Sequence, residues 1–139
     1  SVARDANVPA IYTEYLGSAT CHEAGVMAYV DGCLNVMSML GILDHPSPES
    51  RVERIVEDPR PGSGHMQVCN PSPITGYFEP SVKLGDEVQV GDSLGTVFNQ
   101  TGSDRRTIAA QQSGIVLTLR TFPRVHEGES VGVILETPT

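Results

Sequence analysis

The chain has 139 residues, of which 39% are hydrophobic and 19% are charged; this suits one globular domain, or a small domain with part of another, and excludes wholesale disorder. Its net charge of −8 disfavours nucleic acid and anionic membranes as partners, because both require a basic patch. The sequence also lacks the run of roughly 18 apolar residues that a membrane helix needs.

The cysteines Cys21, Cys33 and Cys69 are odd in number, and their spacing matches no zinc ribbon. No signal peptide is recognisable, and the first residues, SVARDANVPAIYTEY, read like the interior of a larger protein. We therefore expect a reduced, cytoplasmic protein.

The first predicted element is a strand from Pro9 to Leu16, with the sequence PAIYTEYL. On such a strand Glu14 shares a face with Tyr12 and Leu16. Two interpretations of Glu14 stay open. It is a carboxylate at a strand edge, or it is held in a cleft where burial raises its pKa toward that of a general base.

A helix is predicted next, from Glu23 to Leu40. Its apolar residues recur with the helical period, at Val26, Val30, Cys33, Met37 and Leu40. Cys33 is expected to be a small core residue on this apolar face. Gly25 and Gly32 weaken the intrinsic helix propensity, so the helix needs tertiary packing. Gly41 is the predicted stop signal.

The region from Asp44 to Pro73 is a proline-rich connection, and its proline density excludes a long helix. Two short strands fit within it, Arg51–Glu57 and His65–Cys69. The Gly62-Ser63-Gly64 sequence is best explained as flexible linker, because no Lys-Ser/Thr pair follows it as in a phosphate loop.

The second half of the chain contains an internal repeat. VQVGDSLGTV, which begins at Val88, aligns with VHEGESVGVI, which begins at Val125. In each copy a Gly-acidic turn separates a strand centred on valine from a second apolar strand. One copy cannot cover its own apolar face, so we expect the two to enclose a core together across a pseudo-twofold axis.

The predicted strands of this half have short apolar or alternating sequences. They are Gly76–Phe78, Glu87–Val90, Ser93–Asn99, Thr107–Ala110, Gly114–Leu119 and Ser130–Glu136. The polar segment Asn99–Arg106 between the copies is a predicted hairpin or open loop.

This two-copy pattern resembles the biotinyl/lipoyl-type barrel-sandwich hybrid domain. In the carriers of that family, a lysine at the tip of the hairpin between the copies is modified, and it would lie near Ser103. The only lysine here is Lys83, in the first copy, and arginine cannot form the amide. The resemblance therefore implies the fold and not the carrier function.

The order of elements resembles the end of the succinylglutamate desuccinylase/aspartoacylase family. IYTEYLGS is followed by a helix ending in LNVMSMLGIL, by the proline-rich connection and by GYFEPSVKLGDEVQVGDSLGTV. The resemblance implies a mainly β architecture in which a strand–helix remnant of a carboxypeptidase-like α/β domain (1–43) and a connection (44–73) precede a barrel-sandwich hybrid domain (74–139). It also implies a zinc-dependent hydrolase of N-acyl amino acids.

The family's catalytic glutamate carries over to Glu14 in the Thr13-Glu14-Tyr15-Leu16-Gly17 match. The resemblance implies that Glu14 takes a proton from zinc-bound water and later protonates the leaving amine. It places the zinc ligands upstream of this chain, so no metal ligand and no activity are expected from the 139 residues alone. His22 is expected to be exposed or to cap the helix. His126 and Glu129 match the ligand spacing, but they are expected to form a turn.

The resemblance further implies that the β domain packs near the catalytic cleft and narrows access to it, and it leaves self-association open. Arg105 and Arg106 are candidate contacts for an acidic substrate tail, with a solvated turn as the alternative. Two other functions stay open: a non-enzymatic barrel-sandwich binding or adaptor module, and a carrier domain that lacks its lysine.

Overall fold

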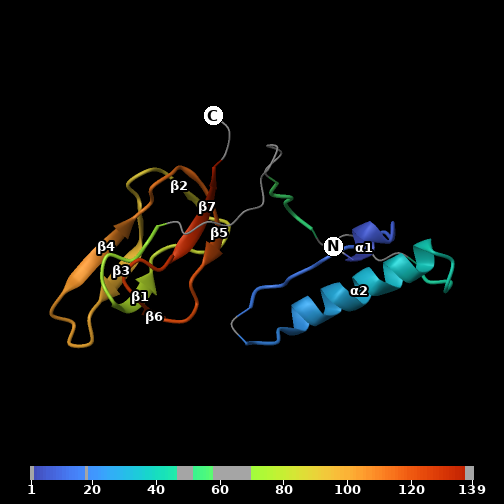
Figure 1. Ribbon diagram of the computed structural model, residues 1–139, viewed down its shortest axis with the longest axis horizontal. Coiled ribbons are helices and arrows are strands. Elements are labelled where there is room, and N and C mark those ends of the chain that lie inside the picture. The colour runs from blue at the N-terminus through green and yellow to red at the C-terminus, as the bar shows by residue number, and fades with distance from the viewer. Residues whose placement is uncertain (1, 18, 47–51, 58–69, 137–139) are drawn as a thin grey trace. The chain divides into compact units, whose positions relative to one another are not determined.

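The computed structural model describes residues 2–17, 19–46, 52–57 and 70–136 (Figure 1). The chain forms two compact units, Ser1–Ile55 and Val56–Thr139. The first unit contains the helices α1 (Val2–Asp5) and α2 (Glu23–Met39). Across the described ranges, neither helix combines the length and the apolar content needed to cross a lipid bilayer.

Helix α2 begins at the predicted residue, Glu23, and ends at Met39, one residue before the predicted end. The stop is a Schellman motif, in which the amide of Gly41 donates to the carbonyl of Ser38 and the amide of Ile42 donates to Met37, both at 2.9 Å. Gly41 has φ = 69°, a left-handed conformation that glycine adopts without steric cost.

The prediction of a buried apolar face on α2 is wrong for this chain. Val26 and Val30 are each 44% exposed, and Cys33 is exposed, so Cys33 is not a core residue. The one buried residue of α2 is Gly25, where an added Cβ would overlap the ring of Tyr15. The physical reason is that a helix buries its apolar face only against a second layer, and the described residues of this unit supply none.

The strand predicted over Pro9–Leu16 is also wrong. These residues have no regular structure, and Leu16 has φ = 50°. A strand requires a neighbour that satisfies its backbone N–H and C=O groups, and no described residue of Ser1–Ile55 belongs to a strand. Residues 52–57 likewise form no strand, and His65–Cys69 lie outside the described residues.

The second unit is built from two antiparallel sheets (Figure 1). Its strands are β1 (Gly76–Pro80), β2 (Glu87–Val88), β3 (Ser93–Phe98), β4 (Arg105–Ala109), β5 (Gly114–Leu119), β6 (Arg124–Val125) and β7 (Gly132–Glu136). One sheet has the order β4-β3-β1-β6 and the other the order β2-β5-β7. The architecture is therefore mainly β, as predicted.

The two sequence copies pair their strands in equivalent registers. Phe78 of β1 lies opposite Val97 of β3, and the aligned Val116 of β5 lies opposite Ile134 of β7. The short strands are exchanged, because β2 of the first copy pairs with β5 of the second, and β6 of the second pairs with β1 of the first. Each copy therefore completes the sheet of the other.

The hydrophobic core follows the same exchange. It consists of two clusters, and each contains side chains from both copies. The first is formed by Phe78, Val97, Ile108, Val125 and Val131. The second is formed by Val88, Leu94, Ala110, Val116 and Ile134. Partly buried Leu119 packs against both. Neither copy buries its apolar residues alone, as the repeat predicts.

Two aligned glycines allow the paired strands to approach. An added Cβ at Gly76 would overlap the carbonyl of Phe98, and one at Gly114 would overlap the carbonyl of Leu135. The two contacts occupy equivalent places in the copies. Any larger residue at either position would separate the strands.

A buried asparagine, Asn70, links the segment before β1 to β7 and to the residues that follow β4. Asn70 is fully buried and has φ = 50°. Its Nδ2 donates to the carbonyl of Gly132 at 3.1 Å, and its Oδ1 accepts from the amide of Gln111 at 2.9 Å. No pattern in the sequence indicates this role, because an asparagine beside Pro71 is typical of a loop.

Candidate functional site

Glu14 lies on the irregular segment that precedes α2, and it is exposed. The hydroxyl of Tyr12, two residues earlier, donates a hydrogen bond to its carboxylate. This hydrogen bond is the main reason why the pKa of Tyr12 is raised above the usual range of a phenol. The carboxylate therefore has one hydroxyl partner and is open to solvent within this unit.

His22 occupies the N-cap position of α2, although its side chain does not cap the helix. Its Nε2 lies 3.1 Å from the hydroxyl of Thr20, and its ring meets Tyr15 edge-on, with 6.5 Å between the ring centroids. His22 is exposed, as predicted, and the alternative that its side chain caps the helix is not observed.

The described residues contain no group of three His, Cys, Asp or Glu side chains that could hold a metal ion.

The pair with ligand-like spacing, His126 and Glu129, forms a turn, as predicted. A carboxylate oxygen of Glu129 accepts from the His126 amide at 3.0 Å and lies 3.0 Å from Nη2 of Arg120. These interactions, the His126 amide first, lower the pKa of Glu129. In the first copy, Asp92 accepts from the amide of Gln89 at 2.8 Å in the same way.

Arg105 and Arg106 are adjacent on β4, and successive strand residues face opposite sides of a sheet. The guanidinium of Arg105 lies 5.4 Å from the ring centroid of Phe98, in a cation–π contact. Nε of Arg106 forms an ion pair with Asp104 at 2.7 Å. The two guanidinium groups therefore lie on opposite faces of the sheet, and the positive charge of Arg106 is paired with Asp104.

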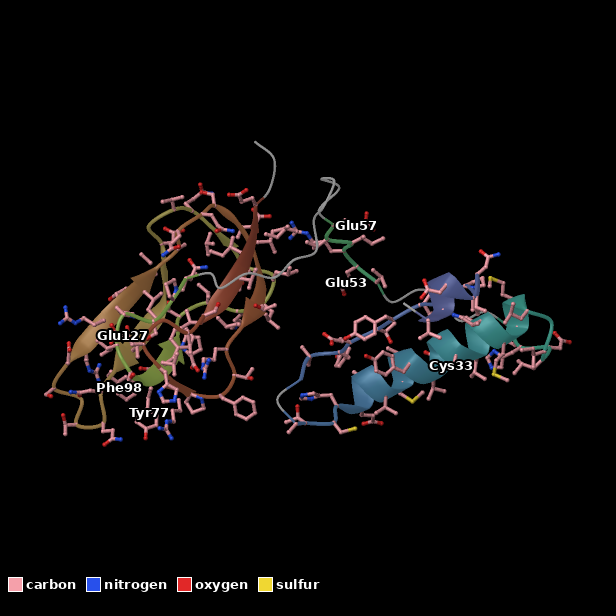
Figure 2. All side chains as sticks on the ribbon, viewed as in Figure 1. Cys33, Glu53, Glu57, Tyr77, Phe98 and Glu127 are labelled. Carbon is pink, nitrogen blue, oxygen red and sulfur yellow. The ribbon has the colours of Figure 1, made fainter. Side chains whose placement is uncertain are left out.

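A row of four side chains crosses the outer face of the four-stranded sheet. Cross-strand partners share a face, and the registers pair Arg105 with Phe98, Phe98 with Tyr77, and Tyr77 with Arg124. The two rings stack with 6.1 Å between centroids and 28° between planes (Figure 2). An aromatic pair thus lies between two cations.

A groove of about 370 Å³ lies beside this row. It is lined by Thr75, Gly76, Tyr77, Asn99, Gln100, Thr101 and Arg124. The sequence reasoning missed Tyr77, Gln100 and Arg124. The signal that was present is alternation: Tyr77 precedes buried Phe78, and Arg124 precedes buried Val125, so both point outward.

No family model matches the sequence, and no curated protein matches it. The fold of this chain is similar to that of solved structures from the succinylglutamate desuccinylase/aspartoacylase family. That from Rhodobacter sphaeroides matches 86% of this chain, with a TM-score of 0.64 and 22% sequence identity. A succinylglutamate desuccinylase from a Silicibacter species matches 83%, with a TM-score of 0.62 and 24% identity.

The product-bound ectoine utilization protein EutE from Ruegeria pomeroyi matches 87% of this chain, with a TM-score of 0.64 and 24% identity. The chain spans 34% to 37% of the length of these three structures. With TM-scores of 0.62 to 0.64 at 22% to 24% sequence identity, these matches show a shared fold.

Proposed function

We propose that this chain is the C-terminal part of an amide hydrolase that deacylates N-acyl amino acids, of the succinylglutamate desuccinylase/aspartoacylase type. The observation that carries the proposal is the extent of the structural likeness. A match over 83% to 87% of the chain includes residues of both units, and the Thr13-Glu14-Tyr15-Leu16-Gly17 sequence lies in the first of them.

The surface of α2 supports this proposal. Its exposed apolar side chains include Val26, Met27, Tyr29 and Val30, each 40% to 44% exposed. Apolar residues in successive turns of one helix favour burial against another layer. The proposed cover is the rest of the catalytic domain, which also supplies the zinc ligands and the neighbouring strand that residues 9–16 lack.

In this proposal Glu14 is the group that transfers protons during amide hydrolysis. Carboxylates perform this step best when burial or neighbouring charge brings their pKa near the working pH. Tyr12 already donates to the carboxylate, so it orients Glu14. Burial by the remainder of the domain would complete the environment, and the 139 residues alone are proposed to be inactive.

The β unit is proposed to be a barrel-sandwich hybrid domain. The equivalent registers of its two copies and the exchange of their short strands support this. It is not a carrier in this proposal, because the hairpin between the copies holds Ser103 and no lysine. Its proposed role is to limit access to the cleft or to associate with a second subunit. Arg105 is the better candidate for an acidic substrate tail, since Arg106 is paired with Asp104.

The test is deacylation of N-succinyl and N-acetyl amino acids by the full-length protein, with zinc content measured on the same sample. Glu14→Gln should lower kcat by about 100-fold or more and leave zinc content unchanged, because it removes the proton-transfer group only. Glu23→Gln, a matched change of an exposed glutamate in the first turn of α2, should leave kcat unchanged. Unchanged turnover by Glu14→Gln would show that the role given to Glu14 is wrong.

A further inference from the structure

Three polar side chains in the groove have no partner among the described residues. These are the hydroxyl of Tyr77, the amide of Gln100 and the guanidinium of Arg124: none of them makes an ion pair, and none makes a hydrogen bond. They come from β1, from the hairpin after β3, and from β6. Polar groups that converge on one hollow from separate elements are typical of small-molecule sites.

The hairpin wall of the groove is held by its own hydrogen bonds. Oδ1 of Asn99 accepts from the Thr101 hydroxyl at 3.2 Å and from the Asp104 amide at 3.3 Å, and Nδ2 of Asn99 donates to Ser103 at 3.1 Å. The side chains of Asn99 and Thr101 are therefore engaged within the hairpin. This wall gives the groove a fixed form, so that binding need not order it first.

The chemistry of the open groups selects the ligand. An arginine guanidinium presents a planar fork of donors that matches a carboxylate with two parallel hydrogen bonds. The stacked rings of Tyr77 and Phe98 offer a flat apolar surface beside it. Arg124 is the one cation among the described residues that line the groove, and the chain carries a net charge of −8; both favour a singly charged ligand over a phosphate dianion.

We propose that this groove binds a small carboxylate that carries a flat ring, with the carboxylate on Arg124 and the ring against Tyr77. Its volume of about 370 Å³ is near the lower end of the usual range for small-molecule pockets. The site lies wholly on the second unit, and the proposal does not depend on the hydrolase function or on Glu14.

The experiment titrates the 139-residue chain with sodium benzoate and follows amide chemical shifts by NMR. Saturable shifts should concentrate on Thr75, Gly76, Gln100 and Thr101, with weaker binding at higher salt. Acetate, which lacks the ring, and benzamide, which lacks the charge, should each bind more weakly than benzoate. Phosphate should bind no better than acetate.

Two variants separate the contributions of charge and ring. Arg124→Gln should weaken benzoate binding about tenfold or more, because a charge-assisted hydrogen-bond pair is lost. Tyr77→Leu should weaken benzoate and leave acetate unchanged. Lys83→Gln makes the same change in net charge outside the groove and should have no effect on benzoate. The NMR spectrum of each variant shows whether it is folded.

Three results would overturn the proposal: no saturable shift at any concentration of benzoate, shifts centred away from the groove, or equal benzoate affinity in Arg124→Gln and Lys83→Gln. Equal binding of benzamide and benzoate would also do so, because the carboxylate would then play no part. Each of these outcomes is independent of Glu14→Gln, so the groove and the hydrolase function are tested separately.

Discussion

Replacement of Asn70 provides the most direct test of how the second unit is held together. The side chain is fully buried, and its amide bonds both to Gly132 and to Gln111. In Asn70→Ala the carbonyl of buried Gly132 loses this partner, at a cost of about 1 to 3 kcal/mol, and the amide of exposed Gln111 loses a hydrogen bond that contributes about 0.5 to 1.5 kcal/mol.

The backbone adds a second cost. Asn70 has φ = 50°, a conformation that asparagine tolerates and alanine disfavours by about 1 kcal/mol. The free energy of unfolding should therefore fall by about 2.5 to 5.5 kcal/mol in Asn70→Ala. A loss of that size is a large share of the stability of an ordinary domain.

The assay is urea unfolding of the 139-residue chain, followed by the circular dichroism of its β-strands. Asn70→Gly removes the same hydrogen bonds and tolerates the positive φ, so it should be more stable than Asn70→Ala by about 1 kcal/mol. Asn99→Ala, in the more accessible hairpin, should cost no more than about 1 kcal/mol. If Asn70→Ala cost no more than Asn99→Ala, or were more stable than Asn70→Gly, the reasoning would be refuted.

Gly114→Ala should lower the free energy of unfolding by about 3 kcal/mol or more, because its Cβ would overlap the Leu135 carbonyl. Gly102→Ala, where the space is open and φ is 71°, should cost only about 1 kcal/mol, and equal losses in urea would contradict the close approach. Glu129 has a lowered folded pKa, chiefly through the His126 amide, so its contribution is present above the unfolded pKa and is lost as the pH falls through the folded pKa. The Tm of Glu129→Gln should accordingly be lower than that of the wild type at neutral pH, and the two values should converge in acid. A difference in Tm that stayed constant with pH would exclude this linkage.

The β unit was predictable because the sequence states its pattern twice. The strand Gly114–Leu119 is observed with the predicted bounds, and β1, β3 and β7 are observed within a few residues of them. The aligned Gly-acidic turns located the positions where the chain reverses. The start of β4 was missed by two residues, because Arg105 and Arg106 read as part of the polar loop.

The first unit was less predictable because its structure depends on partners. The local pattern of PAIYTEYL is that of a strand, but strand formation is decided by whether another strand is beside it. The helix was predicted to within one residue, since its hydrogen bonds are internal and its stop signal is Gly41. Its packing was wrong, because periodicity shows which side chains share a face and not what covers them.

The candidate groove illustrates the same limit from the other direction. Its residues come from segments as far apart as Tyr77 and Arg124, and only the strand registers bring them into one row. No motif links them in the sequence. The hairpin residues 99–101 were recognised as polar, but the sequence did not show that they form a wall beside an aromatic pair.

The exchange of short strands has an evolutionary consequence. β2 completes the sheet of the second half, and β6 completes that of the first. An ancestral gene that encoded a single half would therefore have produced a protein that folded only as a homodimer. Tandem duplication would then have fused such a pair end to end, with the Asn99–Asp104 hairpin as the join. The two halves, expressed as separate chains and then mixed, should accordingly associate and form the two-sheet fold.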